Sequence, residues 1–211
     1  MAEISKLYEL KRIIKRCDRI KDFTEVENLD VSNIKNMSNA FCECKNLTQI
    51  DLSKWDVSNV KDMRCMFFGC ARLIKINILN WDVSNVLNLS SMFANCYNLR
   101  DLDISKWNIS KVVNIESMFF RCQSLKYLDL SKWDVSNVKY MESVFYRCDD
   151  LQTLNLSSWD ITKNKRNLFC VCSSCEKLEC LKILNFNAID TVFIDNEHKL
   201  NIIDALLFTL D

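Results

Sequence analysis

A tryptophan recurs every 26 residues through most of this chain, and this period constrains the fold more than any other feature. The positions are Trp55, Trp81, Trp107, Trp133 and Trp159, and Leu29 stands in the same slot one period earlier. Self-similarity at a period of about 20–50 residues is typical of repeat proteins, in which one unit cannot bury its own apolar edge and stacks on its neighbours. The period therefore predicts one continuous stack of repeats and not separate globular domains.

Other residue types keep step with the tryptophan. Aliphatic residues follow it by two and five positions, phenylalanine by twelve and cysteine by fifteen, as in Val57, Val60, Phe67 and Cys70. The segment that closes each repeat has the form Leu-x-x-Leu-x-Leu, whose period of two puts apolar side chains on one face of a short strand. The middle segment has apolar residues at helical spacing. The sequence therefore predicts an α/β repeat fold, a right-handed leucine-rich-repeat-like solenoid with one short parallel strand and one short helical segment per repeat.

Both ends of the chain carry a different pattern, which predicts caps. Between Glu3 and Lys21, apolar residues recur at steps of three or four with Lys and Arg on the other face. A membrane-surface helix can look like this, but the ends of a repeat stack need a cover, so we interpret the segment as a capping helix. His198–Leu210 has the same spacing. The expected organisation is a single structural domain with an N-terminal capping helix over 1–23, six repeats over 24–186, the last delayed by one inserted residue, and a C-terminal cap over 187–211.

The composition limits the classes of partner. Lys plus Arg and Asp plus Glu both number 28 and are interspersed, whereas nucleic-acid binders usually carry a basic excess or stripe, so no nucleic-acid partner is expected. No run of about 18 apolar residues occurs, so no membrane span is expected. Met1–Leu10 has no positive-then-apolar signal segment and no lipobox-like cysteine. These observations predict a cytoplasmic protein whose 12 cysteines are free thiols.

One repeat in particular resembles a known family. The run Asp56-Val57-Ser58-Asn59-Val60-Lys61-Asp62-Met63-Arg64-Cys65-Met66-Phe67-Phe68-Gly69-Cys70 is similar to the repeat of the BspA-like leucine-rich-repeat surface-protein family. The family pattern is Trp-Asp-Val-Ser-Asn-Val, then Met, Met-Phe, Cys and Leu-x-x-Leu-Asp-Leu-Ser, and the resemblance runs over about 24–183. It implies binding or adhesion, possible host interaction and no enzymatic chemistry. Many members are exported or lipid-anchored, and the absence of either signal here favours an intracellular version, located in the host cytoplasm if it is virus-encoded.

A cluster of cysteines is the sharpest candidate for chemistry. Cys170, Cys172, Cys175 and Cys180 are close enough in sequence to suggest a zinc thiolate site, although they do not form two Cys-x-x-Cys pairs. Cys172 and Cys175 also occupy the Phe and Cys slots of the repeat, one residue late. We expect no metal and no cofactor, and a cysteine-based metal-binding or redox protein is the alternative. His198 is the only histidine and no Gly-rich phosphate loop is present, so we expect no enzyme.

The outward positions of the predicted strands are the candidate binding face. One slot carries Asp or Asn in each repeat, a pattern of a solvated face more than of acid–base pairs or calcium ligands. A second slot varies between repeats, and Tyr127 is its aromatic member. The predicted protein-binding residues are Lys75, Asn77, Asp101, Asp103, Tyr127, Asp129, Thr153 and Asn155. The predicted function is a non-catalytic protein–protein interaction scaffold with a protein partner, and a purely structural or self-assembling protein is a further alternative.

Overall fold

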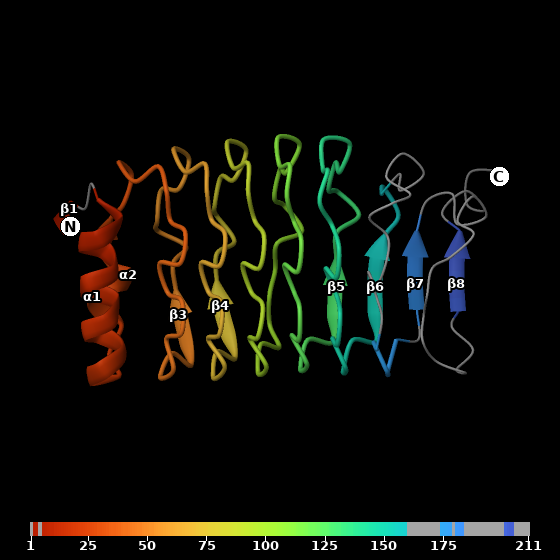
Figure 1. Ribbon diagram of the computed structural model, residues 1–211, viewed down its shortest axis with the longest axis horizontal. Helices are drawn as coiled ribbons and strands as arrows, with labels where there is room; N and C mark the ends of the chain where they lie inside the picture. The colour runs from red at the N-terminus through yellow and green to blue at the C-terminus, as the bar shows by residue number, and fades with distance from the viewer. Residues whose placement is uncertain (1, 4–5, 160–173, 179, 184–200, 205–211) are drawn as a thin grey trace.

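The computed structural model describes residues 2–3, 6–159, 174–178, 180–183 and 201–204. A helix lies at one end, and the repeats follow one another in chain order along the long axis with their strands side by side (Figure 1). Five repeats are described over their full length, each ending at its tryptophan: 30–55, 56–81, 82–107, 108–133 and 134–159. We refer to them as repeats one to five.

The strands are short and all pair in parallel. They are β1 (Ala2–Glu3), β2 (Leu29–Asp30), β3 (Gln49–Asp51), β4 (Lys75–Asn77), β5 (Tyr127–Asp129), β6 (Thr153–Leu156), β7 (Cys180–Ile183) and β8 (Asn201–Asp204). Three sheets result, with the orders β1-β2, β3-β4 and β5-β6-β7-β8. The β3–β4 and β5–β6 pairings join equivalent positions of neighbouring repeats, such as Ile50 with Ile76 and Leu128 with Leu154. Thr153 pairs with Cys180, one residue later than the period, which confirms the insertion predicted in the sixth repeat.

Turns, and not helices, form the middle segment of each described repeat. In repeat two the backbone N–H groups of Met63 and Phe67 donate to Asn88 and Met92 of the next repeat at 2.9 Å. A helix uses these groups within its own segment. The chain alternates direction through left-handed residues, such as Gly69 with φ 70°. The predicted helical segment per repeat is therefore wrong for these repeats. Successive three-residue turns space apolar side chains by three and four, as a helix does, so the pattern alone could not separate the two.

A helix lies in the N-terminal segment for which the sequence predicts a cap. Helix α1 (Leu7–Ile20) buries Leu10, Ile14 and Cys17, and it is followed by the single turn α2 (Thr24–Glu27). The Asp18 carboxylate accepts the backbone N–H of Asn46 at 2.8 Å, which ties α1 to repeat one. Helix α1 begins later than expected because Ala2–Glu3 pairs with β2 as a strand.

The predicted C-terminal helix is wrong where it can be tested. Asn201–Asp204 forms β8, which pairs with β7. A strand that continues the sheet by one more row covers the last repeat with backbone hydrogen bonds, which an amphipathic helix does not offer. The other residues of this expected cap lie outside the described residues.

The core consists of ladders of like side chains. The tryptophan rings of neighbouring repeats stack with centroids 6.3 Å apart for Trp81 and Trp107 and 6.5 Å apart for Trp107 and Trp133. The phenylalanines stack beside them, with Phe93 and Phe119 at 5.9 Å. All five tryptophans are at most 4% exposed, as the predicted burial requires. Burial of each large side chain contributes about 1.5–3 kcal/mol, so the stability is spread along the stack. Among the described residues, no helix is long and apolar enough to cross a membrane.

Candidate protein-binding face

The eight residues predicted from the sequence lie together on the outer side of the strands. They belong to β4, β5, β6 and the segment 101–103 of repeat three. Lys75, Asp101 and Tyr127 are exposed, whereas Ile76 and Leu128, the residues that alternate with them, are 4% exposed. Alternation along a strand explains this separation of outward and inward side chains. We define this surface, with Lys75, Asn77, Asp101, Asp103, Tyr127, Asp129, Thr153 and Asn155, as the strand face.

Side chains in the Asp/Asn slot of the strand face stabilise the turn that follows the strand. The Asp103 carboxylate accepts the Ser105 hydroxyl at 2.7 Å and its backbone N–H at 3.1 Å. These two hydrogen bonds hold the pKa of the Asp103 carboxyl below its ordinary value. Asp129 accepts the Ser131 N–H at 2.9 Å in the same way. The regular slot therefore forms turns, and the variable slot with Lys75, Asp101 and Tyr127 carries the surface chemistry.

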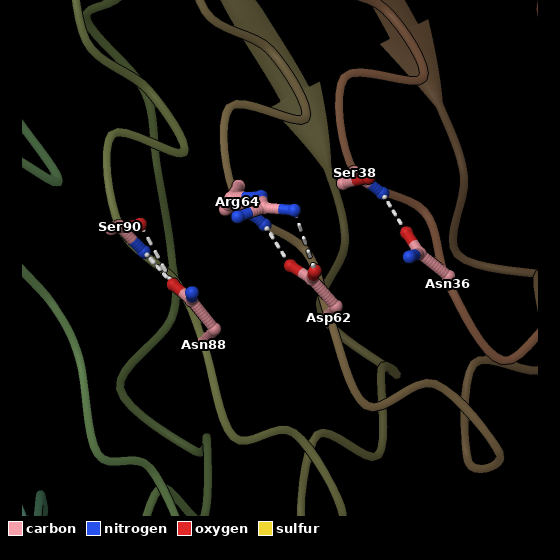
Figure 2. Close-up of polar contacts among 6 residues, drawn as sticks. All are labelled: Asn36, Ser38, Asp62, Arg64, Asn88 and Ser90. Atoms are coloured by element: carbon pink, nitrogen blue, oxygen red, sulfur yellow. Dashed lines mark hydrogen bonds and ion pairs between the residues drawn. The ribbon is translucent and has the colours of Figure 1, made fainter.

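The same device recurs in a second ladder away from the strand face. Figure 2 shows the side chains of Asn36, Asp62 and Asn88 in three successive repeats, each accepting the backbone N–H of the residue two positions further on, at 2.8, 3.0 and 2.9 Å. Isolated bridges join these residues from repeat to repeat. Side-chain oxygens that bond a nearby backbone N–H stabilise turns without Gly or Pro, and this chain has one glycine and no proline. This ladder is structural.

A groove of about 480 Å³ opens on the strand face at repeat three. It is lined by β4 with Ile78 and Leu79, by residues 100–103 and by Tyr127. Leu102, one of these lining residues, is only half-buried, whereas its equivalents in the neighbouring repeats are buried. The lining of the groove therefore combines apolar residues with the charged side chains of Lys75, Arg100 and Asp101.

Strand pairing is interrupted at repeat three, where the groove lies. Lys75 and Asp101 form a single bridge, and β4 and β5 belong to different sheets. After β3 and β5 the next residue bonds to the following repeat: Leu52 N–H donates to Asn77 O and Leu130 N–H to Asn155 O, both at 2.9 Å. Within the part of the chain that the structure describes, Ile78 and Ile104 have no such bond.

The hydrogen bonds of the stacked tryptophans are interrupted at the same repeat. Four tryptophans donate their indole N–H to the carbonyl of the residue 29 positions earlier: Trp55 to Val26, Trp81 to Leu52, Trp133 to Ile104 and Trp159 to Leu130, at 2.8–3.3 Å. The Trp107 Nε1 atom is buried without a partner. The equivalent carbonyl belongs to Ile78, which lines the groove. The hydrogen bond that joins the other neighbouring repeats at this position is therefore missing between repeats two and three.

Sequence reasoning found the strand face but missed the groove. One signal was present. Repeat three is the only described repeat with Asp on both sides of its central strand residue, at Asp101 and Asp103. Aspartate is depleted in strands, and two on one face repel each other.

The buried cysteine ladder has a structural role. The Cys96 thiol donates to Phe67 O at 3.2 Å, and the Cys122 thiol to Phe93 O at 3.1 Å. Burial raises the pKa of Cys70, Cys122 and Cys148 well above the ordinary thiol value. Metal ligation and nucleophilic attack require the thiolate, so these positions are poorly suited to either. In the described residues the cysteine side chains are unpaired.

The cysteine cluster is described only in part. The Cys175 thiol donates to Phe145 O at 3.1 Å and so continues the ladder. Cys170 and Cys172, the side chain of Cys180, and His198 lie outside the described residues. Among the residues that are described, no group of three or more His, Cys, Asp or Glu side chains is placed to hold a metal ion.

Stacked repeats with leucine-type strands and alternating inward and outward side chains define a protein of the leucine-rich-repeat class. Residues 8–126 and 70–179 match the family described as "Mycoplasma protein of unknown function, DUF285", and the chain belongs to this family. Among solved structures it is similar to a leucine-rich repeat protein from Bacteroides ovatus, with 20% identity and a TM-score of 0.44. The match covers 80% of this chain and 42% of that protein, so the chain spans less than half of its length. No curated protein sequence matches the chain.

Proposed function

We propose that this chain is a non-catalytic scaffold that recognises a protein partner through the strand face. The observation that carries the proposal is the contrast between the inner and outer slots of the strands. The inner slots repeat buried aliphatic residues, whereas the variable outer slot presents Gln49, Lys75, Asp101, Tyr127 and Thr153 in successive repeats. A surface that changes from repeat to repeat on a regular core provides specificity without a change in the fold.

The chemistry of this surface suits a protein partner. Tyr127 is 62% exposed, and its hydroxyl donates to the Gln152 side-chain oxygen at 2.8 Å, which restrains the ring. Exposed, restrained aromatic side chains are common anchors in protein interfaces. The neighbouring charges have both signs, which suits a partner with a complementary pattern and not a phosphate backbone.

The finer assignments are part of the same proposal. We assign the chain to the BspA-like branch of leucine-rich-repeat proteins, with a right-handed solenoid over 24–186 between caps at 1–23 and 187–211. We place it in the cytoplasm, or in the host cytoplasm if it is virus-encoded. The 26-residue pattern supports the assignment to this branch and to a solenoid.

A comparative pull-down tests the proposal. The variant Lys75→Ala/Asp101→Ala/Tyr127→Ala removes three exposed side chains of the strand face. A matched control, Lys35→Ala/Lys61→Ala/Leu87→Ala, removes three exposed side chains beside the second ladder. We expect the unaltered chain and the control to capture the same protein from native cells, and the strand-face variant to lose it with an unchanged melting temperature. Capture of the same protein by all three chains would rule out the strand face.

A further inference from the structure

The groove at repeat three has features that the rest of the strand face lacks, and they point to a particular kind of ligand. We propose that it binds an extended peptide segment of the partner protein, with an acidic, an apolar and a basic side chain on one face of that segment. This inference deepens the proposed function and rests on it.

Unused backbone groups are the first feature. In the described residues, no backbone–backbone hydrogen bond joins Leu102 or Asp103 to repeat two or repeat four, and from repeat four the Ile104 carbonyl accepts only the Trp133 indole N–H. The strands on either side of this segment, β4 and β5, are end strands of their sheets. Unpaired backbone groups beside such a strand are a template for an extended peptide, which offers N–H and C=O groups at the same spacing. The other repeats use the equivalent groups for β3–β4 and β5–β6 pairing.

The buried indole of Trp107 is the second, independent feature. Its Nε1 atom has no partner, and the side chain is 2% exposed. A buried donor without an acceptor is unfavourable by about 1–3 kcal/mol. In the other four tryptophans the acceptor is the carbonyl equivalent to that of Ile78, a residue of the groove. A peptide that orders the groove edge therefore changes the surroundings of this N–H, which makes Trp107 a reporter of occupancy.

The charges around the groove have a direction. Among the charged residues that line the groove, Lys75, Arg100 and Asp101 lie at the amino-terminal end of the strand segments, and Asp103 lies at the carboxyl-terminal end. The amino-terminal end is therefore net positive and the carboxyl-terminal end is negative. Within the described chain, no ion pair involves Lys75 or Arg100. The two ends are three residues apart, about 10 Å at the rise of an extended chain. A peptide with a carboxylate at one end and a cation at the other is complementary to this pattern.

The apolar residues of the groove determine which side chain of the peptide lies between its two charged side chains. Leu102 is half-buried, and Leu79 and Tyr127 are 39% and 62% exposed. Side chains at positions one, three and five of an extended peptide share a face. The pattern Glu-x-Leu-x-Lys, or its reverse, therefore places the leucine over Leu102 while the two charges reach the opposite ends of the groove.

Titrations of the folded chain with defined peptides test this inference by NMR. The probes are capped nonapeptides with the centre Glu-Thr-Leu-Thr-Lys or Lys-Thr-Leu-Thr-Glu, which cover both chain directions. Gln-Thr-Leu-Thr-Gln and Lys-Thr-Leu-Thr-Lys are the controls. Loss of a signal in Trp107→Phe assigns the Trp107 indole N–H among the five tryptophans.

We expect at least one mixed-charge peptide to shift the Trp107 indole signal with a Kd below about 1 mM. Either control peptide should bind about tenfold more weakly, as should the mixed-charge peptide to Arg100→Glu or Tyr127→Ala. Lys132→Glu, an exposed lysine next to Trp133, is the matched charge control and should bind as the unaltered chain does.

Two results overturn the inference. One is the absence of any shift with both mixed-charge peptides up to about 2 mM, and the other is equal binding of the mixed-charge and control peptides. The pull-down separates this failure from failure of the proposed function. A partner that still depends on Lys75, Asp101 and Tyr127 while no peptide binds means that the strand face acts without an inserted segment.

Discussion

The paired variants Trp81→Phe and Trp107→Phe isolate the effect of the interrupted repeat. Trp81 and Trp107 are 4% and 2% exposed, and their rings stack on each other. Replacement of an indole by a phenyl ring removes the same apolar group in both, so this loss cancels in the comparison. The two differ in the indole N–H, which bonds to Leu52 O at 2.8 Å in Trp81 and has no partner in Trp107.

The magnitude follows from the two hydrogen-bonding states. Trp81→Phe loses one hydrogen bond, worth about 0.5–1.5 kcal/mol net. The Leu52 carbonyl still accepts the Trp55 N–H at 3.0 Å, so no new unsatisfied acceptor is created. Trp107→Phe removes an unsatisfied buried donor, a gain of about 1–3 kcal/mol. We therefore expect Trp107→Phe to be more stable than Trp81→Phe by about 1.5–4.5 kcal/mol.

Urea unfolding followed by far-UV circular dichroism measures this difference without relying on tryptophan fluorescence. Trp133→Phe is the control, because the Trp133 indole N–H bonds to Ile104 O at 3.2 Å, and it should resemble Trp81→Phe. Equal loss of stability in all three variants, or the largest loss in Trp107→Phe, would refute the reasoning on repeat three.

Three further predictions concern the ladders. Phe93→Ala, in the middle of the phenylalanine stack, should lower the free energy of unfolding by about 3–5 kcal/mol in urea titrations, and a loss below about 1 kcal/mol would contradict the packing. The pKa values of Asp51 and Asp103 are lowered by hydrogen bonds from Ser53 and Ser105, so their folded pKa values lie below the unfolded value of about 3.9. Their contribution to stability is complete above that pH and is lost as the pH falls through the folded values. The variant Asp51→Asn/Asp103→Asn keeps a side-chain oxygen that accepts the serine hydrogen bonds but does not titrate, so the melting temperature should fall less steeply at acid pH. An unchanged acid dependence would contradict the contribution of these two carboxylates. Burial raises the thiol pKa of the ladder cysteines, so iodoacetamide should modify Cys122 and Cys148 only as fast as the protein unfolds. Modification of these thiols within minutes at pH 8 would show that they are open to solvent. A count of 12 free thiols in the denatured protein tests the prediction that all cysteines are reduced.

The repeat period was sufficient to predict the burial of the tryptophan, phenylalanine and cysteine ladders. Trp, Phe and Cys at fixed offsets lie over their equivalents because every repeat has the same length, so the stacking follows from spacing alone. The outward position of Lys75, Asp101 and Tyr127 followed from alternation along a strand in the same way. These features depend only on residue type and distance along the chain.

The form of the middle segment could not be predicted from spacing. Met63, Met66, Phe67 and Cys70 are three or four positions apart or adjacent in the sequence, a spacing that fits both a helix face and a series of turns. What decides between the two is whether a backbone N–H bonds within its own repeat or to the next one, as the Met63 N–H does to Asn88 O. That choice depends on the neighbouring repeat being already in place, which a local pattern does not contain.

The groove could not be predicted from the sequence for a related reason. Asp101, Leu102 and Asp103 preserve the order of polar and apolar residues, so the periodicity shows no defect at repeat three. What sets repeat three apart in the sequence is the pair of aspartates that flank Leu102. A hydrogen-bond inventory of each repeat reveals the interruption, whereas the pattern of apolar residues does not.

The most direct test of the whole account is acrylamide quenching of the native protein's tryptophan fluorescence. The account requires the repeats to lie flat on one another, with all five indoles at most 4% exposed. It predicts a quenching constant that is a small fraction of the value for the urea-unfolded chain. A native constant close to the unfolded one would mean that the indoles face water, and the stacked arrangement would then be wrong.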